Sequence, residues 1–257
     1  MTEKSFSNSY DNPLQGDKRE AENNGFFDFK DDFIQIKDSY KTIIENIEKA
    51  KLRAGRRDEV RLMAVTKTVP YQKVNYAVSL GIDLLGENRV QEFLGKFEMY
   101  DKKSEIHFIG GLQNNKVKYI IDKVSLIHSV DSEKLAEEIG KRAVRLNKVM
   151  DILIEVNIGG EESKGGVSPE YADELVSRCF EIPGVRPKGF MTIPPPDSNG
   201  SSERYFEAME RIYSDCRSRY GGVIDTLSMG MSQDYEQAVL HGSNIVRVGS
   251  ALFGKRK

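Results

Sequence analysis

Hydrophobic residues in the first clearly patterned segment of the chain recur at helical spacing. From Phe33 to Ala54, apolar side chains alternate at steps of three and four residues, and Gly55 follows as a helix stop. This spacing predicts one long amphipathic helix. Residues 1–28, by contrast, are rich in Asn, Ser, Asp and Gly and show no usable period. We expect them to form a disordered or weakly ordered tail, and residues 29–257 to form the folded part of the protein.

After this helix, short β-rich runs alternate with helix-length stretches. The eight runs are Val60–Thr66, Ile82–Leu85, Ile106–Ile109, Leu126–Val130, Ile152–Val156, Lys188–Ile193, Thr226–Met229 and Asn244–Val248. Two of the stretches between them, 132–147 and 203–220, carry apolar residues on one helical face. Repeated β–α units imply a parallel sheet covered by helices. Eight units in about 200 residues match a (β/α)₈ barrel better than an open doubly wound sheet.

The two ends of the folded segment sharpen this expectation. After the eighth run and the Gly249-Ser250 turn, only residues 251–257 remain, which is too short a segment for a full covering helix. The helix at about 31–54 is therefore expected to cover the gap beside the last strand. The predicted fold class is α/β: a single (β/α)₈ TIM barrel with an N-terminal helix and a flexible N-terminal tail, and without a second domain.

Composition and charge exclude several kinds of partner. Thirty-eight Lys and Arg against forty Asp and Glu leave a net charge of −2, so no global field favours nucleic acid or an anionic membrane. The longest apolar runs are far shorter than the roughly 20 residues that a membrane span needs. Cys179 and Cys216 are isolated and are expected to be packing residues in a reducing compartment. The N-terminus carries acidic residues and lacks a targeting pattern, which predicts a cytoplasmic protein.

In a (β/α)₈ barrel, the chemistry is expected in the loops that follow the strands. Phosphate groups are commonly held after strands seven and eight, where small residues let backbone N–H groups approach. The segments 228–232, Ser-Met-Gly-Met-Ser, and Gly249-Ser250 supply Gly and Ser at both loops. Ser232 is further interpreted as the N-cap of a following helix with an acidic first turn. Each segment alone is typical of an ordinary turn, but their joint placement predicts a phosphate site.

Lys67 is the candidate nucleophile. It follows an apolar strand, which would bring its amine to the barrel mouth, where desolvation lowers an amine pKa. The alternative is a surface lysine at a strand end. A reactive lysine beside a phosphate site indicates either a Schiff-base aldolase or a pyridoxal-phosphate protein. Arg247, two residues before Gly249, is interpreted as facing the phosphate or the cofactor ring, with a salt bridge inside the barrel as the alternative.

Other candidate residues carry less weight. Lys164 lies in the Gly-rich loop after the fifth run and is considered as a second amine for cofactor exchange, against a solvated loop lysine. His107, His128 and His241 are not expected to cluster, so we expect no metal site.

Several segments, in chain order, resemble one known family. They are Ala64–Thr68, Gly86–Asn88, His107–Gly110, Leu112-Gln113 with Asn115-Lys116, His128–Asp131, Val156-Asn157 with Gly160–Lys164, Gly189–Met191, Leu227–Ser232, and Val246–Ser250 with Phe253-Gly254. The family is that of the pyridoxal-phosphate homeostasis proteins, which are related to the barrel domain of alanine racemase. The resemblance covers residues 31–256. This chain departs from the family pattern in its tail, in Thr66 where Ser is common, and in Gly111 where Pro is common.

The resemblance implies pyridoxal 5′-phosphate as the cofactor and Lys67 as its attachment point, through an internal aldimine. By the same resemblance, the phosphate-binding segments hold Ser228, Met229, Gly230, Ser232, Gly249 and Ser250. Arg247 and Asn88 would lie beside the cofactor ring. The family is associated with intracellular balance of the cofactor, without an established turnover, which implies that enzymes requiring pyridoxal phosphate are its partners. We further expect a monomer.

Two other functions stay open on the sequence. A pyridoxal-phosphate-dependent amino-acid racemase needs a second proton donor opposite the lysine, which related racemases take from an additional domain and a partner subunit. Because the sequence continues for only seven residues after Ser250, we expect that face to be open and turnover to be weak or absent. A phosphosugar aldolase acting through Lys67 is the third possibility.

Overall fold

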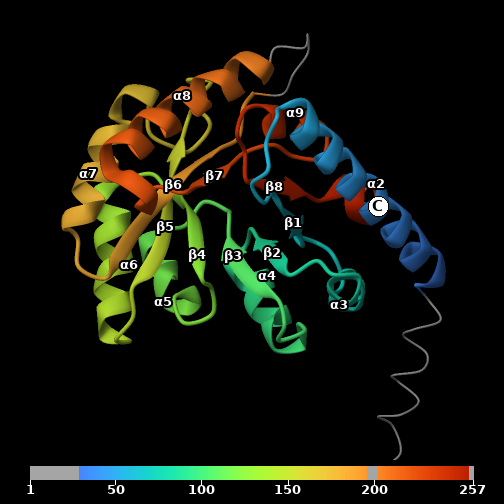
Figure 1. The fold of residues 1–257 in the computed structure, drawn as a ribbon. Coiled ribbons are helices and arrows are strands. Elements are labelled where there is room, and N and C mark those ends of the chain that lie inside the picture. The colour runs from blue at the N-terminus through green and yellow to red at the C-terminus, as the bar shows by residue number, and fades with distance from the viewer. Residues whose placement is uncertain (1–28, 196–201, 255–257) are drawn as a thin grey trace, which may run out of the picture.

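The structure, a computed structural model, describes residues 29–195 and 202–254 (Figure 1). Within these ranges, eight parallel strands close into a barrel in which each strand pairs with the next one along the chain and β8 pairs with β1. The strands are β1 Arg61–Val65, β2 Leu84–Glu87, β3 Glu105–Phe108, β4 Leu126–Val130, β5 Met150–Val156, β6 Val185–Thr192, β7 Thr226–Ser228 and β8 Ile245–Val248. The predicted (β/α)₈ barrel is therefore confirmed. The predicted tail, residues 1–28, lies outside the described residues.

Helices lie between consecutive strands on the outside of the barrel (Figure 1). The α-helices are α2 Lys30–Arg53, α3 Tyr71–Ser79, α4 Val90–Lys96, α5 Val117–Ile120, α6 Glu133–Arg145, α7 Ala172–Glu181, α8 Ser202–Tyr220, α9 Tyr235–Leu240 and α10 Ser250–Phe253. Short 3₁₀ turns occupy Phe97–Met99, Asn114–Lys116, Pro169–Tyr171 and Gly221–Val223. This arrangement buries both faces of every strand, one against the helices and one inside the barrel.

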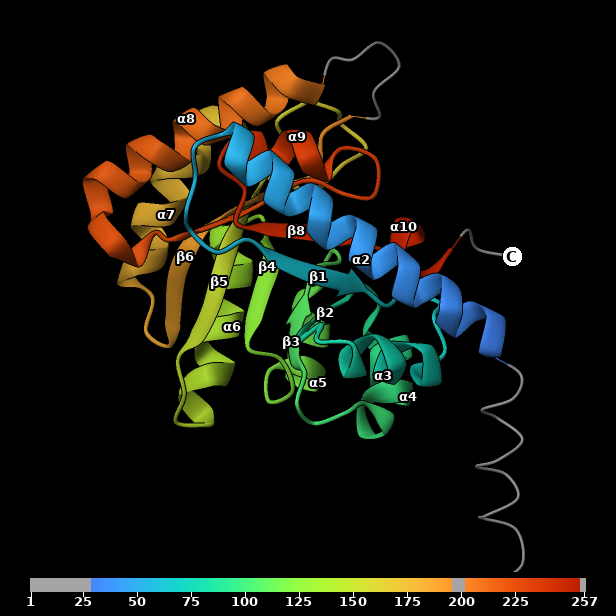
Figure 2. The ribbon, with the colours of Figure 1, turned by 45° about the vertical axis from the view of Figure 1, so that its right-hand side comes forward.

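Helix α2 covers the seam where the barrel closes. It packs on α9, α10 and α3, the helices next to β8 and β1, and it runs across this side of the molecule in Figure 2. Its buried residues are those of the predicted apolar stripe: Phe33, Ile36, Ile43, Ile47 and Ala50. After the helix, Gly55 adopts a φ of +66°, a left-handed conformation that suits glycine at a helix end. The expected long helix and its covering position are confirmed.

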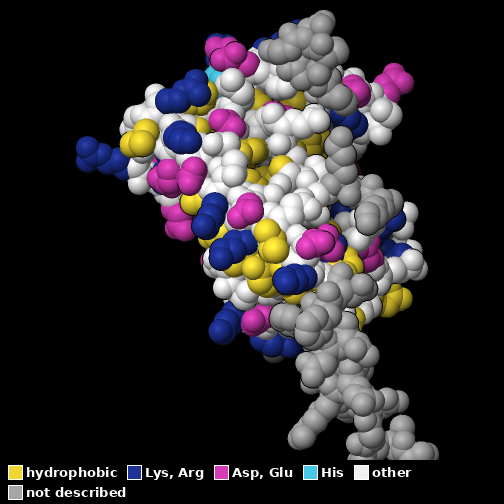
Figure 3. Space-filling model, turned by 90° about the vertical axis from the view of Figure 1, so that its right-hand side faces the viewer, with side chains coloured by type: hydrophobic (Ala, Val, Ile, Leu, Met, Phe, Trp, Pro, Cys, Tyr) yellow, Lys and Arg dark blue, Asp and Glu magenta, His cyan; other side chains and the backbone are white. Residues whose placement is uncertain are grey.

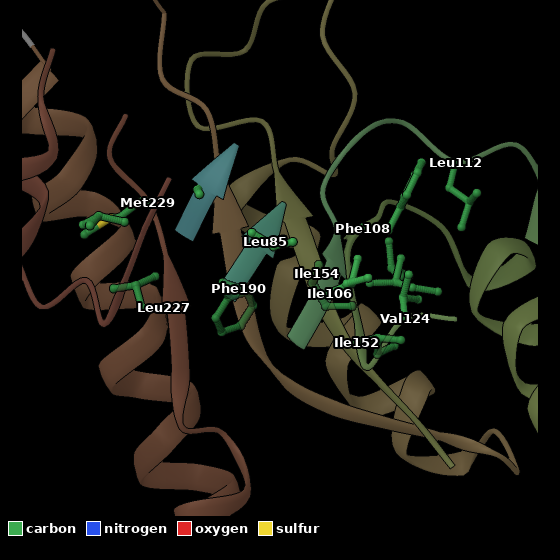
Figure 4. Close-up of a cluster of buried hydrophobic side chains, with 14 of the residues drawn as sticks. Leu85, Ile106, Phe108, Leu112, Val124, Ile152, Ile154, Phe190, Leu227 and Met229 are labelled. Carbon is green, nitrogen blue, oxygen red and sulfur yellow. The ribbon is translucent and has the colours of Figure 1, made fainter. Parts of the chain in front are cut away.

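The outer faces of the strands form the main hydrophobic core with the helices. Figure 4 shows side chains of this core, among them Leu85, Ile106, Phe108, Ile152 and Phe190, projecting from different strands. Full burial of one such side chain contributes about 1.5–3 kcal/mol to folding. Inside the barrel, two smaller apolar clusters remain separate. One contains Met63, Val65, Leu84, Ile109 and Ile245, and the other contains Leu126, Leu153 and Met191.

The predicted strand boundaries differ from the observed ones by a few residues. The second strand was expected at Ile82–Leu85, but it lies at Leu84–Glu87 because Gly86 and Glu87 pair with β3. A Cβ at Gly86 would lie 2.5 Å from the sulfur of Met63. This position therefore needs glycine for close packing inside the barrel, rather than for a turn after the strand.

Charged side chains of both signs share the α2 face of the molecule, and both cysteines are buried. The face that carries α2 shows positive and negative side chains interspersed around small hydrophobic groups (Figure 3). None of the helices in the described ranges combines the length and the apolar character needed to cross a bilayer. Cys179 and Cys216 are buried, and burial raises the pKa of each thiol to about 12. Both are packing residues, as predicted.

Candidate functional site

A cavity of about 780 Å³ opens where the carboxyl ends of the strands meet. Its volume is within the range of small-molecule sites. Six of the predicted cofactor-binding residues line it: Lys67, Asn88, Ser232, Arg247, Gly249 and Ser250. Lys164, Pro194 and Pro195 form part of the wall. Loops far apart in sequence thus place an amine, a guanidinium, hydroxyl groups and backbone amides around one space.

Lys67 lies in a tight turn directly after β1 and is half-buried. The next residue, Thr68, has a φ of +63°, an unusual value for a β-branched residue, and its N–H donates to the carboxylate of Glu92. The Nζ of Lys96 donates to the carbonyl oxygens of Thr66, at 2.9 Å, and Val69, at 3.3 Å. Glu92 and Lys96 also pair with each other at 2.7 Å. Together they hold the turn that presents Lys67.

Glu87 supports the same turn from inside the protein. Its side chain is fully buried, and its Oε1 accepts hydrogen bonds from the Thr66 hydroxyl, at 2.7 Å, and from the Tyr100 hydroxyl. Burial, and then the charge of Glu87, raise the pKa of Tyr100. The phenol therefore stays a donor, and β1, β2 and Tyr100 are tied together just before Lys67.

Ser232 does not have the predicted role of a helix N-cap. Helix α9 begins at Tyr235, three residues later. The Ser232 Oγ instead accepts hydrogen bonds from the backbone N–H groups of Gly249 and Ala251, both at 3.2 Å. The N-cap prediction is wrong because the helix starts three residues after Ser232, and tertiary contacts turn the Ser232 hydroxyl toward the loop after β8. Ser232 thereby joins the two loops of the predicted phosphate site.

Three predicted site residues lie behind the cavity lining. Ser228 is fully buried in β7, and Met229 is part of the main hydrophobic core. The carbonyl oxygen of Gly230 accepts the backbone N–H of Arg247 at 3.0 Å. Gly230 also has a φ of +88°, and a Cβ there would lie 2.5 Å from the Cβ of Ala238 in α9. This segment therefore builds the floor of the site.

Arg247 is 3% exposed and reaches the cavity from β8. Its Nη1 donates to the carbonyl oxygen of Ser228, at 2.7 Å, and to the Ser228 Oγ, at 2.8 Å. Its Nη2 donates to the carbonyl oxygen of Thr192 at 2.8 Å. All three bonds end on neutral oxygen atoms, so they support the cavity-facing interpretation rather than a salt bridge. Burial lowers the pKa of Arg247 to about 10, which keeps the guanidinium charged at neutral pH.

Two further ionisable side chains lie on the β5 side of the site. Lys164 donates to the carbonyl oxygen of Pro194 at 3.2 Å and pairs with Glu161. Glu155 lies in β5, and burial, followed by the charge of Asp131, raises its pKa to about 7. The positive charge of Arg247 acts in the opposite direction. The β5 side of the site thus holds a carboxyl group that keeps its proton to a higher pH than an ordinary glutamate does.

Two of the three histidines do lie together, contrary to the expectation. Nδ1 of His107 lies 2.9 Å from Nε2 of His128, and Nδ1 of His128 lies 3.1 Å from the Ser228 Oγ. The expectation was wrong because β3 and β4 are neighbours whose register brings these inward positions side by side. His241 lies elsewhere, 3.1 Å from Glu210. Over the described residues, no group of three or more potential ligands is placed to hold a metal.

The sequence contained a signal for some of the residues that were missed. His107, His128 and Glu155 interrupt otherwise apolar strands, and a polar residue inside a buried strand indicates a partner or a function. Lys96 and Glu92 gave no such signal, because charged residues on a short helix are ordinary.

The comparisons with known proteins place this barrel first in a broad class. The family described as the alanine racemase N-terminal domain matches residues 39–257. The pyridoxal phosphate homeostasis protein of Aquifex aeolicus is 48% identical over 218 residues, covering 84% of this chain and 96% of the relative. The chain belongs to the pyridoxal phosphate homeostasis protein family. The resemblance inferred from the sequence motifs is therefore confirmed.

Solved structures agree with this assignment. The crystal structure of an unknown protein from Bifidobacterium adolescentis is 33% identical in sequence, with a TM-score of 0.83, and the match covers 87% of this chain and 96% of the other. PipY of Synechococcus elongatus, solved with pyridoxal phosphate bound, is 29% identical, with a TM-score of 0.69. That match covers 81% of this chain and all of PipY.

Proposed function

We propose that this protein binds pyridoxal 5′-phosphate covalently through Lys67 and serves in the intracellular homeostasis of that cofactor. The observation that carries the proposal is that Lys67, Arg247 and the two loops joined by Ser232 all border one cavity. Membership in the homeostasis protein family supports it, as does the relative PipY, whose structure holds the cofactor.

The donor groups around the cavity fit this cofactor. An aldehyde needs an amine, which Lys67 supplies, and a phosphate needs hydrogen-bond donors, which the hydroxyl groups of Ser232 and Ser250 supply. Arg247 and Asn88 would border the ring between these ends. When bound, pyridoxal phosphate supplies an aldehyde that condenses with amines and a ring that withdraws electrons. The protein's own residues would bind and orient it.

Arg247 supports weak turnover or none. A guanidinium has no acceptor site, so it cannot accept a hydrogen bond from a protonated ring nitrogen, and a ring beside it withdraws electrons less strongly. The described residues that line the cavity include no Tyr, His or Cys that would act as a proton donor opposite Lys67. We therefore propose a carrier that releases cofactor to enzymes lacking it. Its monomeric state and cytoplasmic location stay predictions.

The attachment is tested by adding pyridoxal phosphate to the full chain, reducing with borohydride and mapping the adduct by mass spectrometry. We expect one reduced adduct on Lys67 and its loss, together with the visible absorbance, in Lys67→Ala. Lys164→Ala is the matched control, because Lys164 borders the same cavity. It should keep the Lys67 adduct, whereas a main adduct elsewhere in the wild-type protein would refute the assignment.

A racemase-like enzyme is the second candidate function. The observation in its favour is that Lys164, Glu203 and Asp234 border the cavity and offer other proton-carrying groups. Exchange of the α-proton of amino acids in heavy water, followed by NMR, separates the two functions. We expect no exchange above that of free pyridoxal phosphate, and clear exchange that is lost in Lys67→Ala would favour the enzyme.

A further inference from the structure

A line of hydrogen-bonded side chains crosses the interior of the barrel. At the end where the strands begin, Oε1 of Glu105 lies 2.9 Å from Nε2 of His107. His107 contacts His128 at 2.9 Å, His128 contacts the Ser228 Oγ at 3.1 Å, and Arg247 donates to that Oγ at 2.8 Å. The line ends at the cavity, since Arg247 borders it. Four strands, β3, β4, β7 and β8, each contribute to it.

The direction of every bond in this line follows from its two charged ends. The hydrogen bond from His107 keeps the pKa of Glu105 below its usual range, so this carboxylate only accepts. Burial lowers the pKa of both His107 and His128, so each ring is neutral and carries one N–H. His107 must then donate from Nε2 to Glu105, and His128 from Nε2 to His107. The Ser228 hydroxyl is left to donate to His128 while it accepts from Arg247.

We propose that His128 and Ser228 are positioning residues that hold the Arg247 guanidinium toward the cavity, as the last links of a one-directional hydrogen-bond chain anchored on Glu105. The effect on the cofactor rests on the proposed function. The chain itself does not, because it is formed by side chains of the barrel alone. Ser228 thus has a role other than the direct phosphate contact implied by the family resemblance.

The surroundings explain why the chain is well defined. The two apolar clusters inside the barrel leave few other partners for these polar atoms, and a buried polar atom without a partner is costly. Arg61 and Asp151 face the Glu105–His107 end. Glu155 acts on Arg247 at the other end. His107 and His128 are 2% and 0% exposed, so water does not compete for their nitrogens.

The chain makes a specific prediction for the cofactor-free protein. In ¹⁵N NMR spectra of the full chain with labelled histidine, we expect His107 and His128 both as neutral Nε2–H forms between pH 8 and 7. Ser228→Ala removes the donor to His128, so the Nδ1 signal of His128 should shift. Ser129→Ala is the matched control. Ser129, like Ser228, is a buried serine, and it lies next to His128 in β4, but its hydroxyl has no hydrogen-bond partner among the described residues. An Nδ1–H form, or a charged ring, at either position would overturn the proposal.

Titration with pyridoxal phosphate then tests the effect on the site. We expect the dissociation constant to rise about tenfold in Ser228→Ala and in His128→Gln and to stay unchanged in Ser129→Ala. The absorbance maximum of the bound cofactor should shift in the first two variants, because the guanidinium beside the ring is less well held. Unchanged binding and spectra in both variants would overturn the positioning role. If the wild-type protein bound no cofactor, the proposed function would fail, while the NMR experiment would still decide on the chain.

Discussion

At the scale of single residues, the site depends on groups that never reach the cavity. Lys67 is presented by a turn whose unusual backbone is held by Glu92 and Lys96, and Thr66 is tied to the buried Glu87. Such a strained turn persists only when its surroundings determine it. The position of the Lys67 amine is therefore a property of this whole network.

Replacing Lys96 should disturb the turn without touching the cavity. In Lys96→Met, two carbonyl oxygens lose their donor, so we expect the free energy of unfolding to fall by about 1–3 kcal/mol. We also expect weaker cofactor binding, measured by absorbance titration. Lys102→Met is the control, because Lys102 pairs with Glu98 at the same i,i+4 spacing but is 65% exposed. Equal effects of both substitutions would contradict this role of Lys96.

The sequence was sufficient for the residues whose position depends only on the strand order. Lys67 and Arg247 follow or occupy strands, and any parallel barrel brings their ends to one face. Contacts that depend on side-chain direction were not predictable in this way. To predict that His107 contacts His128, one must know the register of β3 against β4. To predict that Ser232 bonds to Gly249, one must know the paths of the loops after β7 and β8.

At the scale of secondary-structure elements, α2 takes the place of a helix after the last strand. The helical period alone predicted both its length and its buried stripe, because a long regular pattern is the strongest signal in a sequence. The strand ends were less predictable, since pairing with a neighbouring strand decides where each one stops.

The covering role of α2 can be tested with two isoleucines of the same helix. Ile47 is 1% exposed and Ile34 is 54% exposed. Ile47→Ala should lower the free energy of unfolding in urea by about 2–5 kcal/mol, because it leaves a cavity over the barrel seam. Ile34→Ala should change it by about 0.5 kcal/mol or less. A similar loss in both variants would mean that α2 is not docked as described.

At the scale of the whole molecule, the barrel interior makes stability depend on pH. His107 and His128 are neutral in the folded state because burial lowers their pKa, whereas an unfolded histidine takes up a proton near pH 6.5. Stability from these groups is thus present above pH 6.5 and is lost as the pH falls. Glu155 acts in the opposite sense, since its folded pKa of about 7 exceeds the unfolded value of about 4.3.

Between pH 6.5 and 5, the two histidines therefore outweigh the single carboxyl group. As the pH falls, the two histidines bind up to two protons in the unfolded state, whereas Glu155 binds about one in the folded state. We therefore expect the free energy of unfolding to fall by up to about 1.4 kcal/mol per pH unit. Urea unfolding at several pH values measures this slope. Glu155→Gln removes the opposing proton and should make the loss steeper. A shallower loss in that variant would show that the sign assigned to Glu155 is wrong.

The closure of the barrel between β1 and β8 determines when, during its synthesis, the protein can first bind a ligand at this site. Met63 in β1 pairs with Arg247 in β8, so the strand that leads to the lysine is completed only by the final strand. While β8 is still inside the ribosome, the part of the nascent chain that has emerged contains Lys67 but neither Arg247 nor the loop of Gly249. We therefore expect the nascent chain not to bind the cofactor. Binding should begin only after β8 has emerged and paired with β1.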